Sequence, residues 1–99
     1  MTQFTVYRNP DGPGYLLNVQ ADVNGHFATR VVVPLFLLDD IKEYAKTLNP
    51  VFEVESHKVV MMTQGLAAVP TKLLKQSVTS LDSRRTDIVS ALELLFQGF

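Results

Sequence analysis

The chain has 99 residues, of which 46% are hydrophobic and 19% charged, and it carries a net charge of −1 at pH 7. This composition excludes intrinsic disorder and predicts a single folded domain over residues 1–99. Nine basic and ten acidic residues provide no electrostatic attraction to nucleic acid or to a membrane surface, so a protein partner is favoured. The chain has no cysteine, and neither His26 nor His57 has further ligands at a suitable spacing. We therefore expect no metal and no cofactor. With no leader-like or membrane-spanning pattern, we also expect a cytoplasmic protein with no membrane partner.

The first third of the chain is typical of antiparallel strands. Polar and apolar residues alternate over Gln3–Tyr7, which predicts a half-buried strand, and Asn9–Gly14 (NPDGPG) predicts a loop. Two longer alternating runs, Tyr15–Val23 and Phe27–Leu35, flank an Asn-Gly pair that favours a type I′ turn, so a long hairpin is predicted. Pro34 is expected to end the second strand or to place it at an edge, because proline lacks an amide donor.

The apolar period then changes from two residues to three and four. This change predicts a short helix over Phe36–Leu48, ended by Asn49-Pro50. Two short strands, Val51–Glu55 and Lys58–Thr63, are predicted to follow, joined by a turn at Ser56-His57.

The last part of the chain ends in a predicted helix. Leu66–Val69 is a candidate strand, and Thr71–Ser80 shows no pattern that indicates regular structure. Ser80 or Asp82 is expected to cap a helix that runs to about Phe96, with Gly98 in the left-handed position beyond its end. The order of elements predicts an α+β fold, in which an antiparallel sheet curls against a terminal helix.

Two groups of residues are candidates for function. Asp22, His26 and Arg30 surround the predicted hairpin turn and are suited to acid–base cleavage of a phosphodiester, although residues beside a turn are more often polar for solvation. The terminal Phe99 lies beyond Gly98 and needs a surface of its own. That surface is the protein's own core, a second subunit, or another partner.

The sequence resembles the CcdB family of toxins from toxin–antitoxin modules over nearly its whole length. The resemblance is carried by a V-Q-x-D to V-P-L hairpin, by an M-T-x-x-x-A-x-V-P segment at Met62–Pro70, and by a last helix that ends in glycine and one apolar residue. The matching stretches are QFTVYRN, NVQADV, RVVVPL, LNPVFEV, VVMMTQGLAAVP and RRTDIVSALELLFQGF.

The resemblance implies a small barrel-like antiparallel sheet of the CcdB/MazF (SH3-like barrel) type, with a minor sheet and a C-terminal helix, in a homodimer. It implies a protein that is not an enzyme, binds the DNA gyrase A subunit and traps gyrase on cleaved DNA. A cognate antitoxin neutralises such a toxin, and the two together repress their operon, with the antitoxin contacting the operator DNA. The positions that match the gyrase-binding residues of the family are Glu93, Phe96, Gln97, Gly98, Phe99, Val23, Asn24 and Gly25.

Two departures from the family pattern are visible. Gln97 stands where gyrase poisons of this family can carry a tryptophan, and Asn24-Gly25 stands where an apolar pair is expected. The alternatives are an endoribonuclease toxin of the MazF type, which shares this fold, and a non-toxic protein that still binds antitoxin.

Overall fold

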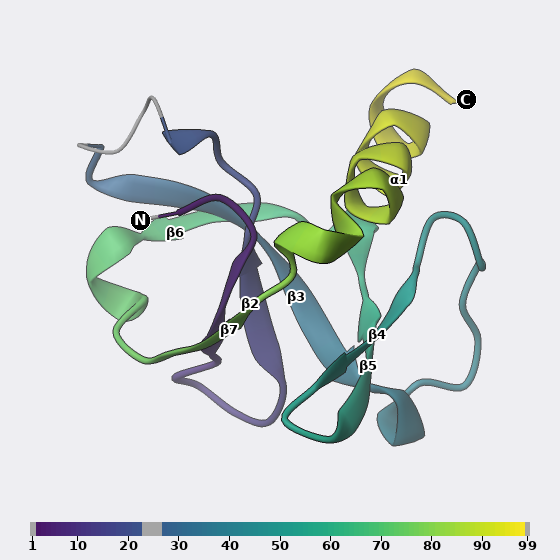
Figure 1. Cartoon of the computed structure of the whole chain (residues 1–99), viewed down its shortest axis with the longest axis horizontal. Helices are drawn as coiled ribbons and strands as arrows, with labels where there is room; N and C mark the ends of the chain where they lie inside the picture. The colour runs from purple at the N-terminus through teal and green to yellow at the C-terminus, as the bar shows by residue number, and fades with distance from the viewer. Residues whose placement is uncertain (1, 23–26, 99) are drawn as a thin grey trace.

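The structure, a computed structural model, describes residues 2–22 and 27–98. Within these residues the chain forms a curled antiparallel sheet and one α-helix at the C-terminus (Figure 1). This architecture confirms the predicted α+β fold. The elements are β1 (Thr5–Arg8), β2 (Tyr15–Asn18), β3 (Thr29–Leu37), β4 (Val51–Val54), β5 (His57–Met61), β6 (Ala67–Pro70), β7 (Ser77–Ser80) and α1 (Arg85–Gln97).

The longest strand, β3, organises the sheet. The strand order is β4-β5-β3-β2-β1-β7, and β6 also pairs with β3. On one side β3 pairs with β2, with Leu17 opposite Val33. On its other side it pairs first with β6 and then with β5. The predicted hairpin is therefore confirmed in its strands, which end at Asn18 and begin at Thr29. The predicted Asn24-Gly25 turn lies outside the described residues.

Pro34 does not end the strand, contrary to expectation. It lies where β3 changes partner, after Val32 has paired with β6 and before Leu35 pairs with β5. Its carbonyl oxygen accepts a hydrogen bond from the Met62 N–H (2.9 Å). The nitrogen of an extended residue points to the same side as its carbonyl. The Pro34 nitrogen therefore faces the gap between β6 and β5. Since no strand pairs with β3 on this side at this point, the missing N–H costs the sheet no hydrogen bond.

The prediction of a helix over Phe36–Leu48 is wrong. Phe36 and Leu37 continue β3 and pair with Val60 and Val59 of β5, because strand pairing outweighs a weak helical period. A short 3₁₀ turn (Leu38–Asp40) and an irregular segment follow. Asn49 fixes the end of this segment: its buried side chain donates to the Met61 carbonyl (3.1 Å) and to Gln64 Oε1 (2.7 Å).

Strands β4 and β5 confirm the second predicted hairpin, with its turn at Glu55-Ser56, one residue earlier than expected. Strand β7 was not predicted, because three of the four residues in Ser77–Ser80 carry hydroxyl groups and the pairing with β1 is what defines the strand.

The hydrophobic core lies between the concave face of the sheet and α1. Leu17, Val33 and Leu35 of the sheet are fully buried there, and Ile88 and Ala91 of α1 pack onto the same cluster. A smaller cluster on the opposite face contains Tyr7, Val32 and Leu74. Burial of a large aliphatic side chain contributes about 1.5–3 kcal/mol, so the concave core supplies most of the apolar stabilisation. Two buried residues of α1 hold the helix on the sheet at its N-terminal half.

Candidate functional site

The C-terminal end of α1 is exposed. The Phe96 side chain is 69% exposed, and Glu93 and Gln97 are also on the surface. The helix ends at Gly98, which adopts the predicted left-handed conformation (φ 79°) and donates its N–H to the Leu94 carbonyl (3.0 Å). Phe99 lies outside the described residues. An aromatic ring at a capped helix end, with most of its surface in water, is suited to contact another macromolecule.

Two arginines fix the beginning of α1. The Arg84 guanidinium lies 4.7 Å from the centre of the Phe52 ring, and the Arg85 guanidinium lies 4.7 Å from that of Phe4. Arg84 also forms an ion pair with Asp87 (2.8 Å), and Arg85 forms one with Asp82 (2.8 Å). Each cation–π contact contributes about 0.5–1 kcal/mol at an exposed site. The helix is therefore held at its first turn and at its buried face, while its last turn extends away from the sheet (Figure 1).

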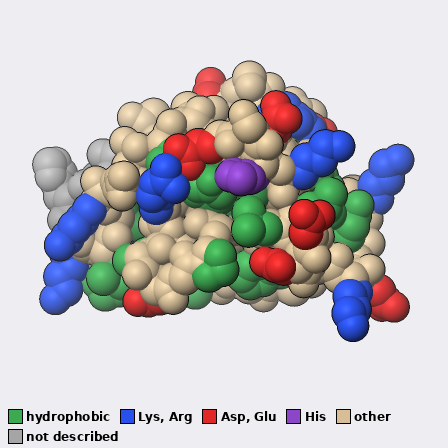
Figure 2. All heavy atoms as spheres, turned by 90° about the horizontal axis from the view of Figure 1, so that it is seen from below, with side chains coloured by type: hydrophobic (Ala, Val, Ile, Leu, Met, Phe, Trp, Pro, Cys, Tyr) green, Lys and Arg blue, Asp and Glu red, His purple; other side chains and the backbone are tan. Residues whose placement is uncertain are grey.

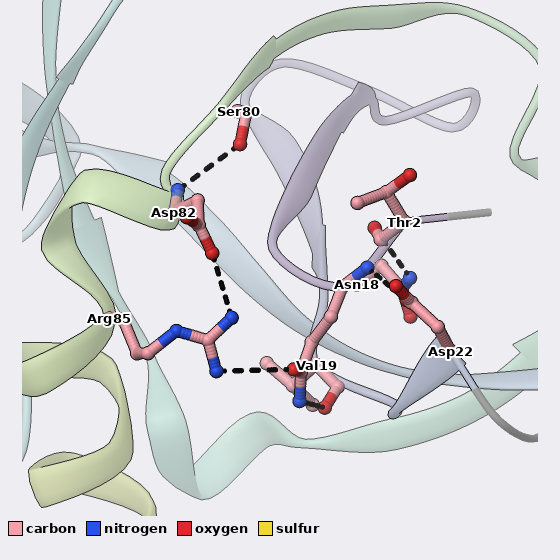
Figure 3. A network of polar contacts seen from close by, with 8 residues as sticks. Thr2, Asn18, Val19, Asp22, Ser80, Asp82 and Arg85 are labelled. Atoms are coloured by element: carbon pink, nitrogen blue, oxygen red, sulfur yellow. Dashed lines mark hydrogen bonds and ion pairs between the residues drawn. The ribbon is translucent and has the colours of Figure 1, made fainter.

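The second part of the predicted site is the connection between β2 and β3. Val23, Asn24 and Gly25 lie outside the described residues, but the chain leading to them is well fixed. The Asp22 carboxylate accepts the Gln3 N–H (2.5 Å), and Gln3 Nε2 donates to the Val19 carbonyl (3.1 Å). Figure 3 shows these contacts beside the Asp82–Arg85 pair, so the N-terminal segment joins this connection to the start of α1.

The described residues on either side of this connection lie apart from the C-terminal end of α1. In Figure 1, the chain that follows β2 up to Asp22 lies at the upper left of the view, and the end of α1 lies at the upper right.

The acid–base set considered from the sequence is not assembled in the described residues. Arg30 is buried, with 1% of its surface exposed, and its charge opposes the rise that burial causes in the pKa of Tyr7. Its guanidinium therefore belongs to the interior on the face of the smaller cluster. Asp22 is engaged with Gln3, and His26 lies outside the described residues.

The structure reveals a polar cluster that the sequence reasoning missed. The Glu55 carboxylate accepts a hydrogen bond from the Tyr15 hydroxyl (2.9 Å) and forms an ion pair with Arg8 (2.7 Å). Glu55 and Ser56 have φ values of 51° and 67°, so the turn places two side-chain-bearing residues in a left-handed conformation. His57 follows directly and lines two adjoining cavities of about 250 and 280 Å³.

Figure 2 looks onto this end of the molecule: a histidine lies near the middle of the view, with acidic, basic and hydrophobic side chains around it. The contacts of Glu55 join residues 40 and 47 positions apart. Local patterns cannot reveal such pairs, and Glu55-Ser56 contains no glycine, asparagine or aspartate that would have indicated a left-handed turn in the sequence.

Tyr15 makes the stability of this cluster depend on pH. Burial raises the pKa of Tyr15 above 10.0, and its hydrogen bond to Glu55 and the charge of Glu55 act in the same direction. As the pH rises, the unfolded chain loses this proton first, so the stability contributed by Tyr15 is present below about pH 10 and is lost above it.

We expect Tyr15→Phe to lower the free energy of unfolding by about 1 kcal/mol at neutral pH, because Glu55 loses a donor. The difference from the unmodified protein should narrow above about pH 10, as urea unfolding at several pH values would show. Parallel curves through this range would contradict the assignment.

Comparison with known families decides which group the chain belongs to. The sequence model of the CcdB protein family matches residues 3–98. The chain belongs to the CcdB family. This membership confirms the resemblance read from the sequence motifs, and it places the protein among the toxins of toxin–antitoxin modules.

One solved structure extends the comparison to the fold. It is described as an endoribonuclease in complex with its cognate antitoxin from Mycobacterial species. This CcdB-family chain matches it with a TM-score of 0.72 and 17% sequence identity, over 94% of this chain and 91% of that chain. The match overturns the expectation that the protein is not an enzyme, because the same fold is used by an endoribonuclease. No helix in the described part of the chain is long and apolar enough to span a membrane.

Proposed function

We propose that this CcdB-family toxin acts on DNA gyrase in the cytoplasm, by binding the gyrase A subunit and trapping the enzyme on cleaved DNA. The observation that carries the proposal is the 69% exposure of Phe96 at the capped end of α1, among the positions that match the gyrase-binding residues of the family. Gln97 and Gly98 extend the same surface, and Phe99 follows them in the sequence.

We also propose that the toxin is a homodimer. Outside the residues that pack on the core, α1 carries apolar side chains that remain partly or largely exposed: Val89, Leu95 and Phe96. A chain of this size buries a modest share of its surface, so pairing of two copies would remove apolar area from water. A dimer would present two helix ends to a symmetric target. The target could then contact the helix end of one subunit and the β2–β3 connection of the other.

Neutralisation by a cognate antitoxin completes the proposal. We expect the antitoxin to cover the toxin, and the complex of both to repress their operon with the antitoxin contacting the operator DNA. The near-neutral charge of the toxin supports this division, because a net charge of −1 provides no net electrostatic attraction to DNA.

The proposal is tested by inducing the toxin in cells that carry normal gyrase or a poison-resistant gyrase A subunit. We expect growth arrest and accumulation of cleaved DNA in the first strain and normal growth in the second. Equal arrest in both strains would contradict gyrase as the target.

A second candidate function is RNA cleavage. It is favoured by the fold shared with an endoribonuclease and by the Arg8–Glu55–Tyr15 cluster beside His57. Incubating purified toxin with total RNA, with His57→Ala as the control, separates the two candidates: cleavage that depends on His57 would establish this second function.

A further inference from the structure

One edge of the sheet has no neighbour among the described residues. Strand β4 is the last strand in the order, and it pairs on one side with β5. An edge strand has unpaired backbone N–H and C=O groups that can bind a further strand. Natural proteins usually cover or interrupt such an edge, so its surroundings show whether it is open to a partner.

The register shows which backbone groups of β4 point outward. The Pro50 carbonyl accepts the Met61 N–H (2.9 Å), which makes this pair hydrogen-bonded. Hydrogen-bonded and non-bonded pairs alternate along an antiparallel ladder, so Phe52 and Val54 bond to β5. Val51 and Glu53 therefore direct their N–H and C=O groups away from β5, to the free edge.

A groove follows this edge. One cavity of about 690 Å³ is lined by Asn49, Pro50 and Val51, and an adjoining cavity of about 480 Å³ is lined by Val51, Phe52 and Glu53. Side chains of successive strand residues point to opposite faces, so a cavity that touches three successive residues lies along the backbone edge itself. At about 3.3 Å per residue, the stretch from Asn49 to Glu53 provides roughly 16 Å of groove.

The walls of the groove have a defined chemistry. Tyr44, 44% exposed, and Arg84 line both cavities, and Figure 1 shows the irregular segment that carries Tyr44 looping out beside β4. Lys46 lines the first cavity and Lys58 the second, and neither makes an ion pair with another described residue. Arg84 and Asp87 largely neutralise each other, since they form an ion pair. Lys46, Lys58 and Arg84 carry three positive charges against the two negative charges of Asp87 and of Glu53, which lies opposite Lys58, so the groove provides an aromatic wall and a net positive charge.

We propose that the free edge of β4 binds an extended, acidic segment of the antitoxin as an additional strand. The inference rests on the antitoxin pairing proposed above. The backbone of the segment would bond to the N–H and C=O groups of Val51 and Glu53, an apolar side chain would lie against Tyr44, and acidic side chains would meet Lys46 and Lys58. A second copy of the toxin is the alternative occupant of this edge, and the concentration dependence of amide exchange described below distinguishes it from the antitoxin.

Hydrogen exchange tests the added strand directly. We expect the amides of Val51 and Glu53 to exchange quickly in the free toxin and at least about tenfold more slowly in the complex with full-length antitoxin, as measured by NMR. The amides of Phe52 and Val54, which already bond to β5, serve as internal controls.

Amides of Val51 and Glu53 that exchange equally in free and bound toxin would overturn the inference while leaving the antitoxin pairing intact. Slow exchange in the free toxin that depends on toxin concentration would assign the edge to a second copy and would also overturn it. An antitoxin that does not bind at all would defeat both proposals.

Substitutions give a second measurement. Glu53→Pro removes an outward N–H without removing a bond to β5, and it should weaken antitoxin binding about tenfold, whereas Glu53→Ala keeps the N–H and should bind equally or more tightly. Lys46→Glu should weaken binding, and Lys42→Glu, an exposed lysine outside the groove, should not. The inference would be overturned if Glu53→Pro bound the antitoxin as tightly as Glu53→Ala, and Lys46→Glu as tightly as Lys42→Glu. Thermal melting of each variant checks that the fold is retained.

Discussion

Replacing Phe96 with alanine is expected to reduce the trapping of gyrase on cleaved DNA by about 30-fold or more, without unfolding the toxin. An aromatic anchor at the centre of an interface typically contributes about 2 kcal/mol or more, which corresponds to this factor. Because the Phe96 side chain is 69% exposed, its removal should change the melting temperature little. The measurement is a titration of purified toxin into a gyrase cleavage assay, with melting followed in parallel.

Thr86→Ala is the matched control for this experiment. Thr86 is exposed on the first turn of the same helix, far along the axis from Phe96. Unchanged trapping by Phe96→Ala would contradict the helix end as the binding surface. A loss of trapping together with a loss of dimer, as measured by light scattering, would assign Phe96 to the subunit interface instead.

Replacing Gly14 with alanine is expected to destabilise the fold by about 2–4 kcal/mol. Gly14 has a φ of 89°, and a Cβ there would lie 2.5 Å from the carbonyl oxygen of Leu35 in β3. The Cβ is bonded directly to the backbone, and the Leu35 oxygen is itself a backbone atom. The contact therefore cannot be relieved by a side-chain movement. The loop Asn9–Gly14 would have to separate from the sheet, and urea unfolding would show the lower free energy of unfolding.

Gly12→Ala provides the comparison within the same loop. A Cβ at Gly12 would meet nothing within 4 Å, and its φ is not in the left-handed range. We expect a change within about 0.5 kcal/mol, or a slight gain from the stiffer unfolded chain. Similar losses for both glycines would show that the loop does not pack on β3 as described.

The elements that the sequence predicted well are those whose patterns agree with their long-range contacts. The alternating run from Tyr15 and the run that ends at Leu35 form β2 and β3, and the final helix ends at Gly98 as its residue type indicates. The prediction failed where tertiary pairing decided the structure. Phe36 and Leu37 have a helical period but extend β3, because β5 lies beside them.

The candidate site was predictable in unequal parts. The exposed end of α1 followed from the family resemblance, since Phe96 and Gln97 lie at matching positions in the sequence. The cluster of Tyr15, Arg8 and Glu55 could not be predicted, because its members are brought together by three separate strands and their loops. The free edge of β4 was also invisible, since strand order is a property of the whole sheet.

The way α1 is attached has a consequence for how such a toxin evolves. Its first turn is held by Arg84 on Phe52 and by Arg85 on Phe4, while its last turn contributes little to the core. Changes at Gln97 or its neighbours should therefore alter the surface that the helix end presents to a partner at little cost in folding. The residues that stabilise the fold and the residues at the exposed helix end are therefore largely separate sets, so substitutions in one set should leave the other unaffected.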